Sequence, residues 1–305
     1  MSTVALLGAA ELGLVFALVA LGVFISFRIL DFPDLTVDGS FPLGAAVAAT
    51  LILADWNPWV ATGIAMLAGA ASGIVTATLN VRFKILHLLA SILTMIALFS
   101  INLRVMGRPN VAILIQDTVL TPFYDLGQTL GLSDAVVRPL FVLAVVLVVV
   151  ALLARFLTSE FGLAMRATGV NARMARAQGV STDLHIYVGM ALSNALVGLA
   201  GALFAQTNGF ADVTSGIGTI VIGLAAVIVG ETVVRSRVIV WMLVGCVVGS
   251  ILYRIAIQVA LNADFIGLRA SDLNLVTALL VAGALILPRI RNPLKARASA
   301  EATSR

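Results

Sequence analysis

The side chains that could carry out catalysis or hold a metal ion are few and scattered in this sequence. The two histidines, His87 and His185, do not form a His-Glu-x-x-His pair, and the single cysteine, Cys246, has no second cysteine to join it. Zinc sites need three or four such ligands together, so we expect no metal site. No Gly-x-Ser-x-Gly sequence is present either, which disfavours a serine hydrolase. The pattern predicts that the chain is not an enzyme.

The sequence also lacks the lysine that nucleotide hydrolysis requires. Lys84 follows Phe83 and Lys295 follows Leu294, whereas a Walker A motif places its lysine directly after a glycine. If the chain takes part in an ATP-driven process, ATP and Mg²⁺ must therefore bind to a separate subunit. We expect no cofactor on the chain itself.

The composition predicts a membrane protein. Of 305 residues, 61% are hydrophobic and only 11% are charged, and the mean hydropathy is +1.10. Soluble domains carry about 25% charged residues, so the composition excludes a water-soluble fold. We expect an all-α, multi-pass membrane protein with a single transmembrane domain, residues 1–305. A cleavable signal peptide is not expected, because Glu11 interrupts the first apolar run and no basic residue precedes that run.

Apolar runs of about 20 residues, the length that crosses a bilayer, define the expected helices. They fall at 5–27, 41–54, 58–79, 88–103, 137–154, 184–207, 217–234, 238–261 and 273–288. The run at 41–54 is too short to cross alone, and Gly39, Pro42 and Gly44 favour a break near its start. We therefore expect about nine spans, with a broken second helix.

Lysine and arginine predict the orientation, because cytoplasmic loops carry an excess of both. If the loop at 158–183 is cytoplasmic, 14 of the 19 basic residues fall on that side, in or beside 28–40, 80–87, 231–237 and the tail 289–305. The N-terminus is then outside and the C-terminus is in the cytoplasm. The net charge of +4 follows from this bias, and we infer no nucleic-acid binding.

The loop at 158–183 is polar but carries helix signals. Ser159 can cap a short helix that Gly169 ends, and Asn171 can cap a second helix that Gly179 ends. The loop is therefore expected to fold into two short helices that form a docking element.

The second of these helices would carry a distinctive surface. Arg173 and Arg176 would share one face, while Ala172, Ala175 and Ala177 would leave the backbone open to a close partner. The alternative is a solvated loop whose arginines only follow the charge bias of cytoplasmic segments.

Several residues of the same loop form a wider pattern. They are Glu160, Phe161, Gly162, Arg166, Ala167, Gly169, Asn171, Ala175 and Gly179. This pattern resembles the cytoplasmic coupling loop of ABC importer permeases, in the superfamily that carries branched-chain amino acids and ribose. A second stretch, FRILDFPDLTVDGSFPLG at 27–44, is similar to the subfamily for tryptophan and tyrosine uptake. The likeness covers nearly the whole chain, and the family pattern is more specific than the substrate label.

The resemblance implies a type II ABC importer-like permease fold in a bacterial inner membrane. The expected substrate is a small polar solute, in the first place an amino acid and among these an aromatic one. The expected partners are an ABC ATPase subunit, a periplasmic solute-binding protein and a second permease copy in a homodimer. The residues of the pattern, with Arg173 and Arg176, would couple the chain to the ATPase.

Polar residues inside apolar spans are costly and are therefore candidates for a transport pathway. Asn102 and Asn194 are the preferred ones, because an amide offers both a donor and an acceptor to a polar solute. Many other polar side chains in the spans can instead join neighbouring helices.

The stretch 34–44 is expected to be irregular backbone at the cytoplasmic end of the pathway, partly within the bilayer. Asp34, Asp38, Ser40 and Phe41 are its candidate pathway or gate residues. The two carboxylates either only cap a helix and fix a turn or take part in gating, and the sequence leaves both readings open. Arg28, Thr36, Ser40 and backbone amides are the expected partners of the carboxylates.

Two further patterns concern the outer side and the symmetry of the chain. The external loop 104–138 carries prolines and aromatic residues and is long enough to be functional, so we expect it to receive the solute-binding protein. The sequence Asp34-Leu-Thr-Val-Asp-Gly-Ser is weakly similar to Asp212-Val-Thr-Ser-Gly-Ile-Gly, on opposite sides of the membrane. This similarity suggests an inverted repeat of spans 1–4 and 6–9.

The main alternative is an ion- or proton-coupled secondary transporter of small solutes. Such a protein would favour paired carboxylates within its spans, which the sequence does not show. Glu231 is expected to pair with Arg235, four residues later, and not to relay protons.

Overall fold

The computed structural model describes residues 3–129, 131, 133–236 and 238–261. Its elements are α1 (Thr3–Val23), η1 (Phe24–Ile29), α2 (Val37–Leu53), α3 (Pro58–Val81), α4 (His87–Met106), β1 (Asn110–Ala112), α5 (Thr121–Thr129), α6 (Asp134–Thr158), α7 (Glu160–Val170), α8 (Ala172–Ala177), α9 (Thr182–Asn208), β2 (Phe210–Asp212), η2 (Val213–Gly216), α10 (Thr219–Val233) and α11 (Ile239–Leu261). The predicted span at 273–288 and the tail 289–305 lie outside the described residues.

The described chain is an all-α bundle, as the composition predicts. Seven helical segments are long and apolar enough to cross a membrane, and α2 is a shorter apolar helix. Together they match the predicted runs up to residue 261. The first span differs in detail, because it ends in the π-helix η1.

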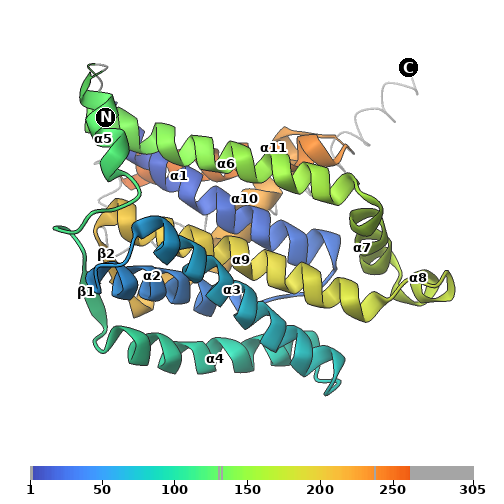
Figure 1. Ribbon diagram of the computed structural model, residues 1–305. Coiled ribbons are helices and arrows are strands. Elements are labelled where there is room, and N and C mark those ends of the chain that lie inside the picture. The colour runs from blue at the N-terminus through green and yellow to red at the C-terminus, as the bar shows by residue number, and fades with distance from the viewer. Residues whose placement is uncertain (1–2, 130, 132, 237, 262–305) are drawn as a thin grey trace, which may run out of the picture.

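The loops lie at the two ends of the bundle, in the two groups that the charge pattern predicts. Figure 1 shows α7, α8 and the turn between α3 and α4 at one end, and β1, β2 and α5 at the other. The loops predicted to be cytoplasmic and those predicted to be external thus lie at opposite ends. Which end faces the cytoplasm stays a prediction.

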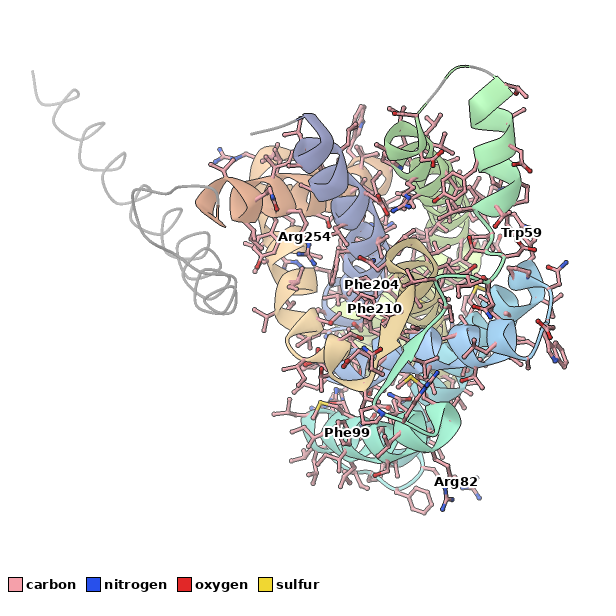
Figure 2. The ribbon with its side chains drawn as sticks, turned by 90° about the vertical axis from the view of Figure 1, so that its left-hand side faces the viewer. Trp59, Arg82, Phe99, Phe204, Phe210 and Arg254 are labelled. Carbon is pink, nitrogen blue, oxygen red and sulfur yellow. The ribbon has the colours of Figure 1, made fainter. Side chains whose placement is uncertain are left out.

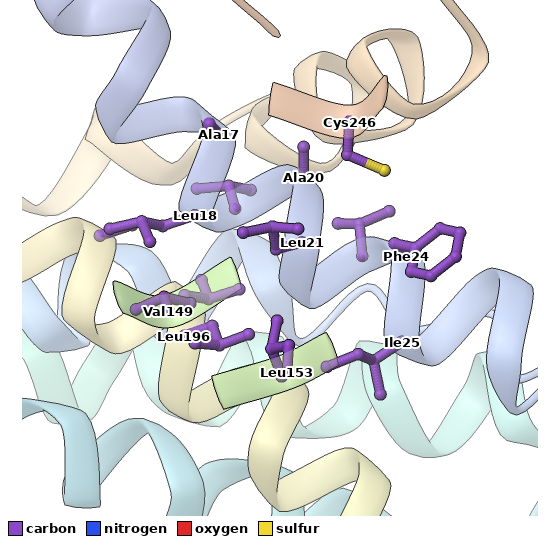
Figure 3. Close-up of a cluster of buried hydrophobic side chains, with 14 of the residues drawn as sticks. Ala17, Leu18, Ala20, Leu21, Phe24, Ile25, Val149, Leu153, Leu196 and Cys246 are labelled. Atoms are coloured by element: carbon purple, nitrogen blue, oxygen red, sulfur yellow. The ribbon is translucent and has the colours of Figure 1, made fainter. Parts of the chain in front are cut away.

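Helix α1 lies at the centre of the hydrophobic core. Its side chains Leu18 and Leu21 are fully buried, and so is Phe24 at the start of η1. They belong to the same cluster as Leu153 of α6 and Cys246 of α11, which Figure 3 shows around them. A helix that is apolar on every face can be surrounded by other helices in this way. The cysteine is buried core filler, as expected.

Glycines allow helices to cross closely at two small-residue pairs, Gly69/Gly73 of α3 and Gly245/Gly249 of α11. A Cβ at Gly69 or Gly73 of α3 would overlap the backbone carbonyl oxygens of Asn194 and Met190 on α9. Gly249 of α11 lies in the same way against the carbonyl oxygen of Ala226 on α10. Such backbone proximity is available only to glycine, and it holds helices together where water provides no driving force.

The start of α2 corrects the predicted broken helix. α2 begins at Val37 and continues through Pro42 without interruption, so the irregular backbone precedes the helix instead of reaching residue 44. Pro42 cannot donate to the carbonyl of Asp38 four residues earlier. Gly216 of η2 packs directly against that carbonyl oxygen, where any side chain would overlap it. The missing hydrogen bond is thus accommodated by a tight contact between elements.

Two matching turns support the suggested inverted repeat. Asp34 Oδ1 accepts from the Thr36 N–H at 2.9 Å, and Asp212 Oδ1 accepts from the Thr214 N–H at 2.7 Å. The first turn precedes α2 and the second precedes α10. The helices before the turns, α1 and α9, run in opposite directions in Figure 1. The similar sequences therefore adopt similar turns in opposite orientations.

Candidate functional site

The N-terminal ends of α2 and α10 meet at Asp38. One carboxyl oxygen of Asp38 accepts from the Ile220 N–H at 2.7 Å, and the other accepts from the Gly218 N–H at 3.2 Å. The first turn of a helix has unpaired N–H groups and a partial positive charge, which an acidic side chain stabilises. Asp38 of α2 therefore caps α10, although the two lie 180 residues apart in sequence.

Asp34 anchors a polar network inside the bundle. Its carboxyl group is fully buried and accepts from Asn194 Nδ2 at 2.8 Å in addition to the Thr36 N–H. Ser40 Oγ donates to Asn194 Oδ1 at 2.7 Å. Asn194 lies near the middle of α9, so this network lies deep between the ends of the bundle. Every member has a partner, as burial requires.

Arg28 is not the partner of either aspartate, contrary to our expectation. It forms a two-pronged ion pair with Glu231 at the end of α10, with Arg28 Nε at 2.6 Å from Glu231 Oε1. The predicted pair of Glu231 with Arg235 is also wrong. Pairing four residues apart needs a continuous helix, and α10 ends at Val233.

A cavity of about 380 Å³ opens beside the junction of α2 and α10. It is lined by Asp38, Gly39, Pro42, Met95, Ile96, Phe99, Ser100, Asn102, Val213 and Ile217. The wall therefore comes from α2, α4 and the η2 segment. Figure 2 shows Phe99 on α4, near the outer edge of the bundle.

Asn102 forms part of the cavity wall and has one unused hydrogen-bonding atom. Its side chain is fully buried, and Nδ2 donates to the Gly39 carbonyl at 3.1 Å. Oδ1 has no hydrogen-bond partner among the described residues. A buried amide oxygen without a partner costs about 1–3 kcal/mol, so such an atom at a cavity wall points to a ligand or water.

The structure separates the predicted pathway residues into two groups. Asp38 and Asn102 line the cavity. Asp34, Ser40 and Asn194 belong to the buried network, and Phe41 stacks on Phe16 with ring centroids 5.5 Å apart. The residues of this second group pack and hydrogen-bond between the helices and so support the elements that form the cavity wall. Whether any of the six residues acts in transport stays a prediction.

Sequence reasoning identified Asn102 of α4 but missed the apolar residues of α4 and of the η2 segment in this wall. Met95, Ile96 and Phe99 look like ordinary apolar residues of a span, and nothing in their spacing marks them. For Val213 and Ile217 a signal was present, because they lie in the stretch that resembles the Asp34 turn.

The predicted docking loop forms two capped helices, α7 and α8. The Ser159 side chain accepts from the Gly162 N–H at 3.3 Å, and Asn171 Oδ1 accepts from the Met174 N–H at 3.0 Å. Gly179 follows α8 with a φ of 84°, as predicted for a residue that ends a helix. These caps confirm that the loop is folded.

Two details of the loop differ from the prediction. Gly169 does not end the first helix, which continues to Val170 and has Asn171 as its C-terminal cap. Gly169 instead packs against the backbone of Ile29 in η1. Ala175 is buried within the chain and is not open to a partner. Gly169 and Ala175 thus take part in packing inside the subunit.

Residues other than Gly169 and Ala175 form the outward surface of the loop. Val170 is 88% exposed and Met174 is 60% exposed, and Arg173 and Glu160 are exposed as well. Arg176 is held by Thr182, with Nη2 at 2.6 Å from Oγ1. Of the other predicted coupling residues, Gly162 is buried, whereas Arg166 and Ala167 are half-buried.

The external loop 104–138 is ordered by contacts with α9 and β2. Strand β1 pairs antiparallel with β2, and Asn110 Nδ2 donates to Asp212 Oδ2 at 3.0 Å. Partial burial raises the pKa of Asp212, but hydrogen bonds from Thr214 and Asn110 outweigh it and leave the pKa below its usual value. The Val119 N–H donates to Gln206 Oε1 at 3.0 Å. The loop thus has its own elements, as predicted.

Metal binding finds no support in the arrangement of side chains. Among the described residues, no three or more His, Cys, Asp or Glu side chains gather in a way that could hold a metal ion. The two carboxyl groups of the junction are occupied by N–H donors.

Comparison with known proteins identifies the family. Residues 5–288 match the family model described as branched-chain amino acid transport system / permease component. The chain is 35% identical to a tyrosine transport system permease protein of Clostridioides difficile strain R20291 over 283 residues, which is 92% of this chain and 90% of that protein. It is 32% identical to the uncharacterized protein RP368 of Rickettsia prowazekii strain Madrid E over 280 residues, 90% of this chain and 95% of that one. No solved structure matches. The chain belongs to the family of permease components of branched-chain amino acid transport systems.

Proposed function

We propose that this chain is the membrane-spanning subunit of an ATP-binding-cassette importer that moves an amino acid into the cell. Membership of the family makes the chain a transport permease component, which is not itself catalytic. A separate ATPase subunit then supplies ATP hydrolysis with bound Mg²⁺. A periplasmic binding protein delivers the solute, and two copies of the permease form the pathway in the bacterial inner membrane.

The contact between α7 and η1 carries this proposal. Gly169 of α7 lies against Ile29, and Leu30 next to it packs on Gly189 of α9. The chain then turns through the irregular segment into Asp34 and α2. A push on α7 from outside the bundle would therefore reach the start of α2, where the cavity lies. This is the mechanical link that ATP-driven coupling needs.

The proposed substrate rests on the relatives and on a cavity wall whose only charged side chain, among the described residues, is that of Asp38. The name of the Clostridioides difficile relative gives tyrosine as its substrate. Amino acids, and aromatic ones first, are therefore the substrates to test here.

A proton-coupled secondary transporter is the alternative that the structure brings into view, because Asp34 lies buried at mid-bundle. Both of its oxygens accept hydrogen bonds, from Thr36 and Asn194, in a fixed turn. Asp38 caps α10 with both oxygens. Fixing the turn and capping α10 account for the two carboxyl groups and favour a structural role for both over proton transfer. A proton relay would need a mobile partner, and the described residues offer none at these oxygens.

The test is uptake of labelled L-tyrosine and L-leucine by cells that express the chain with the ATPase and the binding protein proposed as its partners. We expect import that requires ATP hydrolysis, as judged with a Walker A lysine variant of the ATPase. Import that continues with that variant and stops when the proton gradient is collapsed would establish the secondary transporter instead.

The docking surface is tested by co-purification of the ATPase. Met174→Glu and Val170→Glu should release the ATPase, because they place a charge on exposed apolar residues of the proposed surface. Ile115→Glu is the matched control, since Ile115 is 95% exposed but lies after β1 at the opposite end. Equal ATPase recovery from all variants would remove α7 and α8 from the interface.

A further inference from the structure

We propose that the cavity between α2, α4 and η2 is a transit site for an amino acid with an apolar or aromatic side chain, and that Asn102 Oδ1 accepts a hydrogen bond from its ammonium group. This inference rests on the proposed function and adds a position, a substrate class and a recognising atom to it. Nothing in the family assignment names this cavity or this atom.

The first argument is the unused acceptor. Asn102 is fixed by its bond to the Gly39 carbonyl, so its amide cannot simply turn over to satisfy Oδ1. An ammonium group carries three N–H donors and no acceptor, which matches an isolated carbonyl oxygen. The Asp38 carboxyl group and the Ser100 hydroxyl lie on the same wall. The polar side chains of the wall are thus all able to accept hydrogen bonds.

The second argument is the absence of basic groups. None of the residues that line the cavity is Lys, Arg or His. A carboxylate or phosphate would find no cation on this wall, whereas a cationic group is favoured by Asp38. The ammonium end of an amino acid therefore faces Asn102 and Asp38, and its carboxylate points away from them.

The third argument is the apolar remainder of the wall. Met95, Ile96, Phe99, Val213 and Ile217 provide a hydrophobic surface, and Phe99 is 51% exposed with no aromatic partner among the described rings. Offset aromatic stacking contributes about 0.5–1.5 kcal/mol beyond burial in known pairs, so a free ring favours an aromatic ligand. The volume of about 380 Å³ lies within the range of small-molecule sites. A sugar, which needs hydrogen bonds on all sides, would fit this wall poorly.

The experiment uses Ser100→Cys as a reporter, because Ser100 is exposed and lines the cavity. The native Cys246 is buried and should not react with a thiol reagent. The labelling rate of the reconstituted permease is measured alone and with millimolar L-tyrosine. We expect L-tyrosine to slow labelling several-fold. D-ribose and 3-(4-hydroxyphenyl)propanoate, which lacks the ammonium group, should not.

A pair of variants isolates the acceptor. Asn102→Leu and Asn102→Asp both lose the donor to Gly39, but only the leucine lacks an acceptor. Added to the reporter, Asn102→Asp should keep the protection by L-tyrosine and Asn102→Leu should abolish it. Phe99→Ala should weaken protection by L-tyrosine more than by L-alanine. Leu93→Ala, also exposed on α4 but outside the cavity, is the control for Phe99.

The outcomes distinguish this inference from the proposed function. If cells import L-tyrosine but L-tyrosine does not protect the reporter, or protects it equally in both Asn102 variants, the transit site is wrong and the importer stands. If D-ribose protects and no amino acid is imported, the substrate class in both proposals is wrong.

Discussion

The Cα atom of Gly169 lies directly against the backbone carbonyl oxygen of Ile29, so closely that a methyl group at position 169 would overlap that oxygen. The contact joins α7, in the loop at one end of the bundle, to η1, which leads into the buried turn at Asp34. η1 is a π-helix, a form that is rare and is frequently found at functional sites. The loop at 158–183 is therefore tied to the core packing through α7 and is not an appendage.

Gly169→Ala should destabilise this junction. Because the clash is with backbone, either α7 or η1 must shift, and overpacking of this kind costs about 1–3 kcal/mol. We expect a lower unfolding temperature in detergent and slower uptake. Gly63→Ala is the control, since a Cβ at Gly63 of α3 meets nothing within 4 Å. An unchanged unfolding temperature for Gly169→Ala would mean that the contact is loose in solution.

The buried turn at Asp34 gives a second prediction. Asp34→Ala would leave the Thr36 N–H and one of the two N–H groups of Asn194 Nδ2 without an acceptor, while Nδ2 still donates to the Met190 carbonyl. Each unpaired buried group costs about 1–3 kcal/mol. Asp34→Asn keeps an oxygen for Thr36 and should cost less. Unfolding temperatures of the purified protein check this order. Asp31→Asn is the control, because Asp31 is exposed and its φ of 53° suits asparagine. If alanine is tolerated as well as asparagine, the network does not hold α2.

Local signals in the sequence predicted the helices and their caps well. Runs of apolar residues give the spans because the residues of a span must be predominantly apolar. Ser159 and Asn171 act as caps because their side chains reach N–H groups within three residues. The position of α2 was harder. Pro42 predicts a break, but the helix continues through it, and a glycine far along the chain, Gly216, packs against the Asp38 carbonyl to which Pro42 cannot donate.

Partners that are distant in sequence could not be predicted. Asp38 was expected to pair locally, yet it caps α10. The bond of Asn194 to Asp34 was not expected either, while a role of Asn194 in the pathway stays a prediction. Nothing in the types of these residues says which helix faces them. For the same reason, the sequence identified Asn102 as a candidate but could not show that Phe99 lines the same cavity.

The ion pair of Arg28 with Glu231 gives a third prediction. Arg28→Ala and Glu231→Gln should lower stability by similar small amounts, because exposed ion pairs contribute about 0.2–1 kcal/mol and the Arg28 side chain is 55% exposed. The double variant should lose little more than either single variant. Arg235→Ala, which removes the predicted but absent partner, should have no effect. Additive losses in the double variant would show that the two side chains do not interact in solution.

The last prediction concerns orientation in the membrane. The loop with α7 and α8 lies at the opposite end from β1 and β2, so reagent access at one position on each end decides the whole topology. Ala177→Cys and Ile115→Cys suit this test because both sites are exposed, and the buried Cys246 should give no background. We expect a membrane-impermeant thiol reagent to label Ile115→Cys on intact spheroplasts and Ala177→Cys only after the membrane is opened. The arginines of α8 and the turn after α3 favour this orientation, since basic residues remain on the cytoplasmic side. Labelling of Ala177→Cys in intact spheroplasts would reverse the topology and separate α7 and α8 from any cytoplasmic ATPase.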